Sequence, residues 1–182
     1  ELFKQMKVDQ KTQEIIQKLE NMKQKQEVLE EKTQEAKKGE EMQKLAEKQD
    51  ELGKDMEKLD KDLKDLQQMK QDTKSPDKQQ MDELNQKQDD AEQNMKDAKQ
   101  QMEQNNKKQA NQKQQKAKQK MQEMQEQLEQ MQAQSEMDQQ AENYEDLRNL
   151  LENLIKLSFE QEDTRDRIAR TRTNDPTVRT LI

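Results

Sequence analysis

Apolar residues recur along this chain at alternating intervals of four and three residues. The clearest series is Leu45, Gln49, Leu52, Met56, Leu59, Leu63 and Leu66. Three further series follow the same spacing: Ile15, Leu19, Met22, Gln26, Leu29, Thr33, Ala36; Met81, Leu84, Gln88, Ala91, Met95, Ala98, Met102; and Ala117, Met121, Met124, Leu128, Met131. A 3.5-residue repeat is typical of long helices that pack along a narrow seam. The spacing therefore predicts a coiled coil.

Composition supports helices and excludes an ordinary globular core. Only 26% of the 182 residues are apolar and 41% are charged, whereas a compact domain of this length carries nearly half apolar residues. The chain contains two Gly, two Pro and 34 Gln, together with many Glu, Lys, Leu and Met. The scarcity of Gly and Pro and the abundance of the other five residue types favour helix over disorder. We therefore expect an all-α chain.

One helix boundary has a clear signal. Ser75 can cap the free amide groups of a helix that starts at Pro76, and Pro suits the first helical position. We expect one long helix over 1–72, a turn at 73–75 and a second long helix over 76–159. Because a short turn makes long helices antiparallel neighbours, the sequence predicts a long two-helix coiled-coil hairpin.

The repeat loses phase twice. The first slip lies between Ala36 and Met42, and the second between Gln109 and Ala117. In a hairpin that turns at position 75, two facing residues lie at equal distances from the turn, so their residue numbers sum to about 150. The two slips therefore lie opposite each other. This favours a hairpin over a parallel dimer of one bent helix. Gly39 lies in the first slip, where it permits a close helix approach or marks a hinge.

The densest apolar cluster lies near the C-terminus and is the candidate interface. Its members are Tyr144, Leu147, Leu150, Leu151, Leu154, Ile155, Leu157 and Phe159. In the expected hairpin most of them have no facing residue. They predict contact with other parts of a parent chain, with another protein subunit, or with a second copy. Residues 160–182 are expected to be an Arg-rich connector and the start of a third helix at Pro176.

Catalytic and metal chemistry have little support in the sequence. The chain has no His and no Cys, so the common zinc sites and nucleophile systems are absent. Acidic pairs such as Asp89 and Asp90 lack a pocket that would shift a pKa. Met121, Met124 and Met131 suggest a soft-metal site less than they suggest an adaptable seam. We expect no enzyme activity and no cofactor.

Two basic stretches could contact phosphates. Residues 104–120 contain six Lys and no acid, and an Arg-rich stretch covers 165–172. Neither stretch has interleaved aromatic residues, and the net charge is −7. Glu27, Glu30 and further acidic residues lie opposite the first stretch in the expected hairpin, so its lysines are expected to pair within the chain. Nucleic acid is therefore not an expected partner.

The segment Asn143 to Glu162, NYEDLRNLLENLIKLSFEQE, resembles the LRxLLENLIxLSFxQE segment of an uncharacterised family of large bacterial proteins. The Gln/Lys/Met-rich run from Lys118 to Met124 is similar to that family's helical region. The resemblance implies a membrane-anchored parent protein, with this region on the extracytoplasmic side of a bacterial envelope. It implies membrane contact only through segments absent from this chain, and it supplies no catalytic residues.

These observations favour a structural spacer, scaffold or assembly segment of a larger envelope protein. One alternative is a holdase or adaptor that grips clients with a Met-rich helical surface. A second alternative is a coiled coil associated with nucleic acid. Outside the envelope implied by the resemblance, a cytoplasmic location is the alternative.

Overall fold

The computed structural model describes residues 2–37, 39–71 and 78–170. These ranges contain four helices: α1 (Leu2–Glu35), α2 (Glu40–Gln71), α3 (Lys78–Glu103) and α4 (Lys107–Arg170). The prediction of an all-α chain is confirmed. The chain divides into two units, Glu1–Ala133 and Gln134–Ile182, which are described separately.

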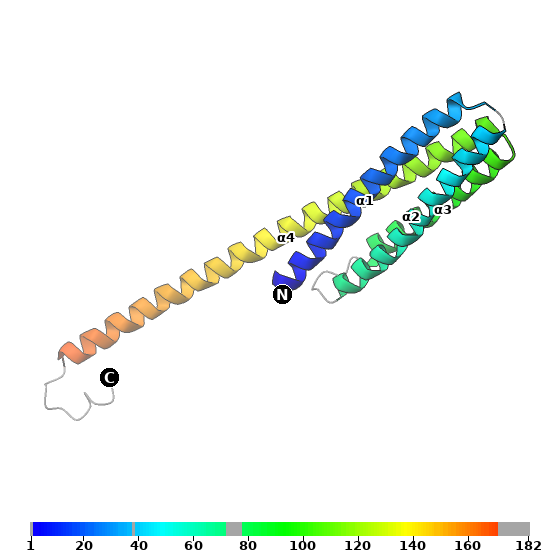
Figure 1. Cartoon of the computed structure of the whole chain (residues 1–182). Helices are drawn as coiled ribbons and strands as arrows, with labels where there is room; N and C mark the ends of the chain where they lie inside the picture. The colour runs from blue at the N-terminus through cyan, green and yellow to red at the C-terminus, as the bar shows by residue number, and fades with distance from the viewer. Residues whose placement is uncertain (1, 38, 72–77, 171–182) are drawn as a thin grey trace. The chain divides into compact units, whose positions relative to one another are not determined.

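The first unit is an antiparallel bundle of α1, α2, α3 and the first part of α4 (Figure 1). Side-chain contacts link each helix to its two neighbours, and along each linked pair the residue numbers rise on one helix while they fall on the other. The linking pairs are Lys11–Asp62 and Lys25–Asp55 for α1 and α2, Lys99–Asp50 and Lys96–Glu57 for α2 and α3, Lys113–Asp97 and Lys120–Asp90 for α3 and α4, and Lys118–Glu30 and Lys23–Gln125 for α4 and α1.

The structure therefore differs from a hairpin of two long helices. The single helix expected over 1–72 is divided into α1 and α2, and the helix expected over 76–159 is divided into α3 and α4. At about 1.5 Å per residue, each of the first two helices is about 50 Å long, whereas a single helix over 1–72 would be about 100 Å long. Because each of the two expected helices is divided and folded back, four apolar seams pack together. A two-helix hairpin would contain only two.

The expected boundaries near the C-terminus also change. Residues 160–170, expected to be a connector, continue α4 as helix up to Arg170. The predicted turn at 73–75, with Ser75 and Pro76, lies outside the described residues, between the end of α2 and the start of α3. The helix start predicted at Pro176 lies outside them as well.

The first predicted phase slip coincides with the break between α1 and α2, whereas the break between α3 and α4, at residues 104–106, lies just before the second slip predicted between Gln109 and Ala117. After α3, Asn105 adopts a left-handed conformation with φ of 55°, and its N–H donates to the Met102 carbonyl at 2.9 Å. The Asn106 N–H donates to the Gln101 carbonyl at 2.8 Å, which completes a Schellman helix end. After α1, Gly39 has φ of 98°, and its N–H donates to the Asn105 Oδ1 at 2.8 Å. The two turns thus lie against each other at one end of the bundle.

The two glycines should respond oppositely to the same substitution. Gly39→Ala should lower the free energy of unfolding by about 1 kcal/mol, because an L side chain is strained at this φ. Gly53→Ala should raise it by about 0.5–1 kcal/mol, because Gly53 lies inside α2 and a Cβ there meets nothing within 4 Å. Urea unfolding followed by circular dichroism measures both. Changes of the same sign would contradict the assigned turn.

Leucine and methionine fill the bundle core. All seven members of the series from Leu45 to Leu66 are buried, as are those from Met81 to Met102. Nine of the 12 methionines are buried as well: Met22, Met42, Met56, Met81, Met95, Met102, Met121, Met124 and Met131. Met121, Met124 and Met131, considered above as metal ligands, all belong to the larger core cluster. Flexible thioethers suit a seam whose facing residues vary in size from Ala to Leu.

A layer of three glutamines, which we call the glutamine layer, interrupts this core. Gln26, Gln49 and Gln114 come from α1, α2 and α4 and are at most 1% exposed. Gln26 and Gln49 exchange two side-chain hydrogen bonds of 3.1 and 2.8 Å, and Gln114 Nε2 donates to Gln49 Oε1 at 3.0 Å. Gln114 Oε1 is buried without a hydrogen-bond partner. Gln49 is therefore the centre of the network.

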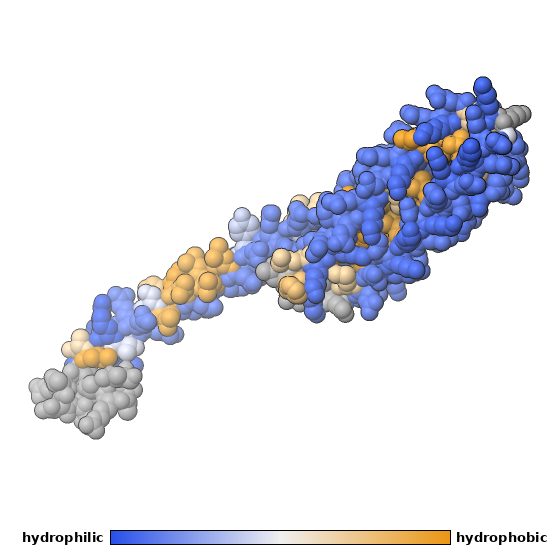
Figure 2. Space-filling view, viewed as in Figure 1, coloured by the Kyte–Doolittle hydropathy of each residue, from blue (hydrophilic) through white to orange (hydrophobic). Residues whose placement is uncertain are grey.

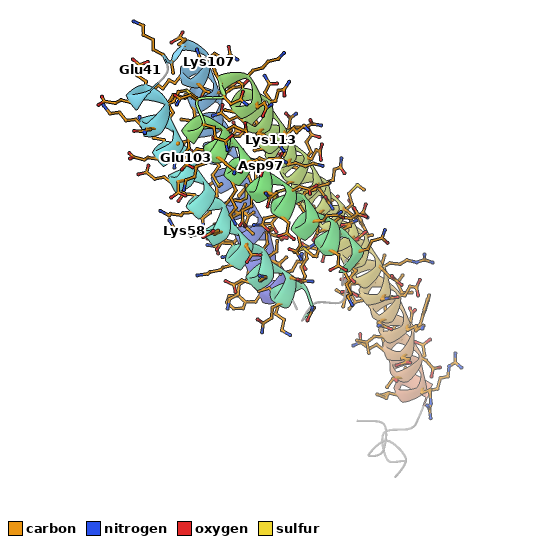
Figure 3. The ribbon with its side chains drawn as sticks, turned by 90° about the vertical axis from the view of Figure 1, so that its right-hand side faces the viewer. Glu41, Lys58, Asp97, Glu103, Lys107 and Lys113 are labelled. Carbon is orange, nitrogen blue, oxygen red and sulfur yellow. The ribbon has the colours of Figure 1, made fainter. Side chains whose placement is uncertain are left out.

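Ion pairs cover the outside of the bundle. Figure 3 shows Asp97 of α3 and Lys113 of α4, whose side chains are 2.6 Å apart. Lys118 pairs with Glu30 at 3.0 Å and lies 3.6 Å from Glu27. Lys107 Nζ donates to the Gln34 carbonyl at 2.8 Å, near the end of α1. Of the basic stretch 104–120, Lys118 thus pairs with two of the acids that were predicted, whereas Lys113 and Lys120 pair with Asp97 and Asp90 of α3.

Asp50 should give this surface a measurable acid dependence. Hydrogen bonds from Lys54 and Lys99 lower the pKa of Asp50 from 3.8 to about 2, so its stabilising effect is present above pH 4 and is lost as the pH falls toward 2. Because the side chain is 35% exposed, we expect an effect of no more than about 1 kcal/mol. In urea unfolding, Asp50→Asn should be less stable than the unmutated chain at pH 6 and equal to it at pH 2. An equal difference at both pH values would contradict this role.

Candidate interaction face on α4

The second unit contains the exposed apolar cluster. Its described residues are the part of α4 from residue 134 to Arg170, a helix rich in residues that favour this conformation. All eight predicted interface residues lie on it and are 47–73% exposed: Tyr144, Leu147, Leu150, Leu151, Leu154, Ile155, Leu157 and Phe159. We call this set the α4 apolar face. Figure 2 shows it as a hydrophobic patch.

Helical spacing places most of these residues on one side of α4. Leu147, Leu150, Leu151, Leu154 and Leu157 follow one another at intervals of three, one, three and three residues, which gives a continuous stripe along a helix. Ile155 and Phe159, four residues apart, flank this stripe. A stripe of this width is broader than a two-helix seam alone requires.

This stripe does not continue the bundle seam. The next positions of the bundle seam after Met131 are Ser135, Asp138 and Glu142, all of them polar. The apolar stripe begins instead at Tyr144, in a different phase of the repeat. The sequence therefore ends one packing surface and begins another within the same helix.

The structure adds residues that the sequence prediction left out. Ile168 is 37% exposed, and with Leu157, Gln161 and Thr164 it lines a shallow depression bordered by Glu160 and Arg165. Leu157, Gln161, Thr164 and Ile168 continue the four-and-three spacing. Sequence reasoning missed this extension because two successive seam positions are polar. The extension could have been found from Ile168, which lies at the position that the four-and-three spacing predicts after Leu157, Gln161 and Thr164.

The charges around the face are exposed and pair locally. Arg148 Nε lies 3.2 Å from Glu152 Oε1, one helical turn away. Arg165 lies 3.4 Å from Glu162 and 3.2 Å from Asp166. Exposed pairs of this kind contribute about 0–1 kcal/mol each. Full burial of one leucine side chain contributes more, about 1.5–3 kcal/mol.

The α4 apolar face is apolar at its centre and charged at its border. Among the described residues, no group of three or more Asp or Glu side chains is placed to hold a metal ion. Within the same residues, no helix is both long enough and apolar enough for a membrane span. The face offers aliphatic and aromatic surface with a charged border, which suits packing against another protein helix.

Comparison with family models, with curated proteins and with solved structures finds no match to this chain. The resemblance described for residues 143–162 therefore stays a prediction.

Proposed function

We propose that this chain is a non-catalytic structural segment of a larger bacterial envelope protein. In this proposal the bundle is a rigid spacer, and the α4 apolar face is the surface through which the segment joins an assembly. The observation that carries the proposal is the contrast between the two units. All eight side chains of the α4 apolar face are exposed, whereas the apolar seams of the bundle are buried.

The spacer role is supported by how the bundle is built. Its core consists of two clusters of buried apolar residues, mainly leucine and methionine, that lie between α1, α2, α3 and the first part of α4. Close packing of buried side chains and ion pairs between neighbouring helices favour a stiff body over a flexible one. The extracytoplasmic location and the membrane-anchored parent are part of the proposal and depend on the resemblance of residues 143–162.

A holdase or adaptor function receives less support. That alternative needs a Met-rich surface open to clients. Nine of the 12 methionines are buried in the bundle, so a client groove lined by methionine would require the bundle to open. The Leu-rich α4 apolar face contains no methionine.

The assembly role is tested by replacing two leucines in the parent protein. Leu147→Gln with Leu151→Gln should remove the parent protein from its high-mass complex on native gels, because both leucines lie within the α4 apolar face. Gln is close to Leu in helix propensity, so the helix should persist. Val28→Gln is the matched control, since Val28 is an exposed apolar residue of α1. An unchanged complex in the double variant would count against the proposal.

The location is tested by cell fractionation. The full-length parent protein should enter the membrane fraction, and this segment should be digested by protease added to spheroplasts. Protection from the protease until the cells are lysed would contradict an extracytoplasmic location.

A further inference from the structure

We propose that the α4 apolar face pairs with the same face of a second copy of the chain, in antiparallel orientation. This inference rests on the proposed assembly function and names the partner of that same surface.

The first argument is the seam itself. Leu147, Leu150, Leu154, Leu157, Gln161, Thr164 and Ile168 alternate in steps of three and four. They span 22 residues, or about 33 Å of helix. A repeat of this kind packs against another helix with the same repeat. In the described part of the first unit, the large apolar residues outside the core are Phe3, Met6 and Val28, which form no such series. An identical α4 offers the matching seam.

The second argument is the distribution of charge. Residues 134–152 contain six acidic residues and one arginine, whereas residues 153–170 contain four acidic and four basic residues. In a parallel pair the two acidic stretches would lie side by side. In an antiparallel pair, each acidic stretch lies along the stretch of the other copy that contains Arg165, Arg167 and Arg170. The charges therefore favour the antiparallel orientation.

The third argument concerns register. Apolar contact is greatest when the numbers of facing seam residues sum to 304. Leu147 then faces Leu157 of the second copy, and Leu150 faces Leu154. Asn143 faces Gln161 of the second copy, so an amide pair lies at each end of the leucines. Leu151 lies beside Leu151 of the second copy.

One charge contact opposes this register, because Asp146 then lies near Glu160 of the second copy. Exposed like charges cost less than the burial of leucines contributes, so the leucines decide the register. The twofold symmetry also closes the assembly at two copies.

Self-association is tested by sedimentation of the full 182-residue chain. Between about 1 µM and about 500 µM the mass should rise from 21.8 kDa to that of two chains. Leu150→Gln with Leu154→Gln should weaken association by more than about a hundredfold, since it removes four leucines from the paired seam. Val28→Gln, on α1, should leave association unchanged. Circular dichroism of each variant should show the same helix content as the unmutated 182-residue chain.

Orientation is tested with introduced cysteines, which are unique because the chain has none. Gln140 and Thr164 face each other across the proposed seam. Chains with Gln140→Cys and chains with Thr164→Cys should form a disulfide when mixed, and neither should form one alone. If each variant crosslinks only with itself, the pairing is parallel and the proposal is wrong.

A chain that stays at 21.8 kDa at every concentration would also overturn this inference. The proposed function would still stand if Leu147→Gln with Leu151→Gln released the parent protein from its complex, because the partner would then be a different protein. If neither test gave an effect, both proposals would fall.

Discussion

Leu128→Ala should lower the free energy of unfolding of the first unit by about 2–5 kcal/mol, the range for removing a buried leucine side chain. Leu128 is fully buried on α4, in the core cluster that includes residues of α1, α2 and α3. The cavity left by the substitution would be lined by side chains whose positions are fixed by helices on every side, so little collapse is possible. Hydrogen exchange of the α2 amides measures the effect, because α2 belongs to the first unit alone.

The same helix supplies the control. Leu151 is 57% exposed, and Leu151→Ala should change the exchange of the α2 amides by no more than about 0.5 kcal/mol. The comparison must be made at low protein concentration, where pairing between copies would not add to stability. Equal losses for Leu128→Ala and Leu151→Ala would mean that both leucines belong to one core. The division into two units would then be wrong.

The spacing of apolar residues was sufficient to predict most of the side chains that are buried in the bundle. Spacing alone predicted the seam from Leu45 to Leu66, and every member of it is buried. This works because burial in a helical bundle depends on a local property, the angle at which residues lie around the helix. The exposed α4 apolar face was predicted by the same local property, since its density exceeds what a two-helix seam needs.

The number of helices could not be predicted in the same way. A heptad repeat has the same apolar spacing in a two-helix coiled coil and in a four-helix bundle. The phase slip at Gly39 signalled a disturbance, but a hinge, a close approach and a turn all suit glycine. The second break depends on Asn105, which reaches a left-handed conformation at low cost and accepts the hydrogen bond from the Gly39 amide. That hydrogen bond joins residues 66 positions apart. A pattern of neighbouring residues in the sequence cannot predict such a contact.

The glutamine layer was only partly predictable. Gln26 and Gln49 lie at seam positions of the repeat, so their burial followed from spacing. Gln114 lies within the second phase slip, in the stretch where the seam had been lost, and was not expected in the core. Its hydrogen bond to Gln49 joins α4 to α2 and exists only because the chain folds into four helices.

The three glutamines should differ sharply in what their replacement does to stability. Gln49→Leu should lower the free energy of unfolding by about 2–4 kcal/mol, because it leaves the buried amides of Gln26 and Gln114 without partners. Gln114→Leu should change it by less than about 1 kcal/mol, because the two bonds between Gln26 and Gln49 remain and the unpaired Gln114 oxygen is removed. Urea unfolding of the two variants measures the difference, and equal losses would contradict the network.

Replacing all three glutamines with leucine should restore the stability lost in Gln49→Leu, and should match or exceed that of the parent chain. No buried amide is then left unpaired, and leucine has a volume close to that of glutamine. Leucines alone do not distinguish the native alignment of the helices from one displaced by a heptad, whereas a buried polar layer does. We therefore expect the triple variant to be stable but less uniquely packed, with broadened methyl resonances in its NMR spectrum. Sharp, single resonances in that variant would show that the layer does not fix the alignment, and the turns at Gly39 and Asn105 would then be the elements that do.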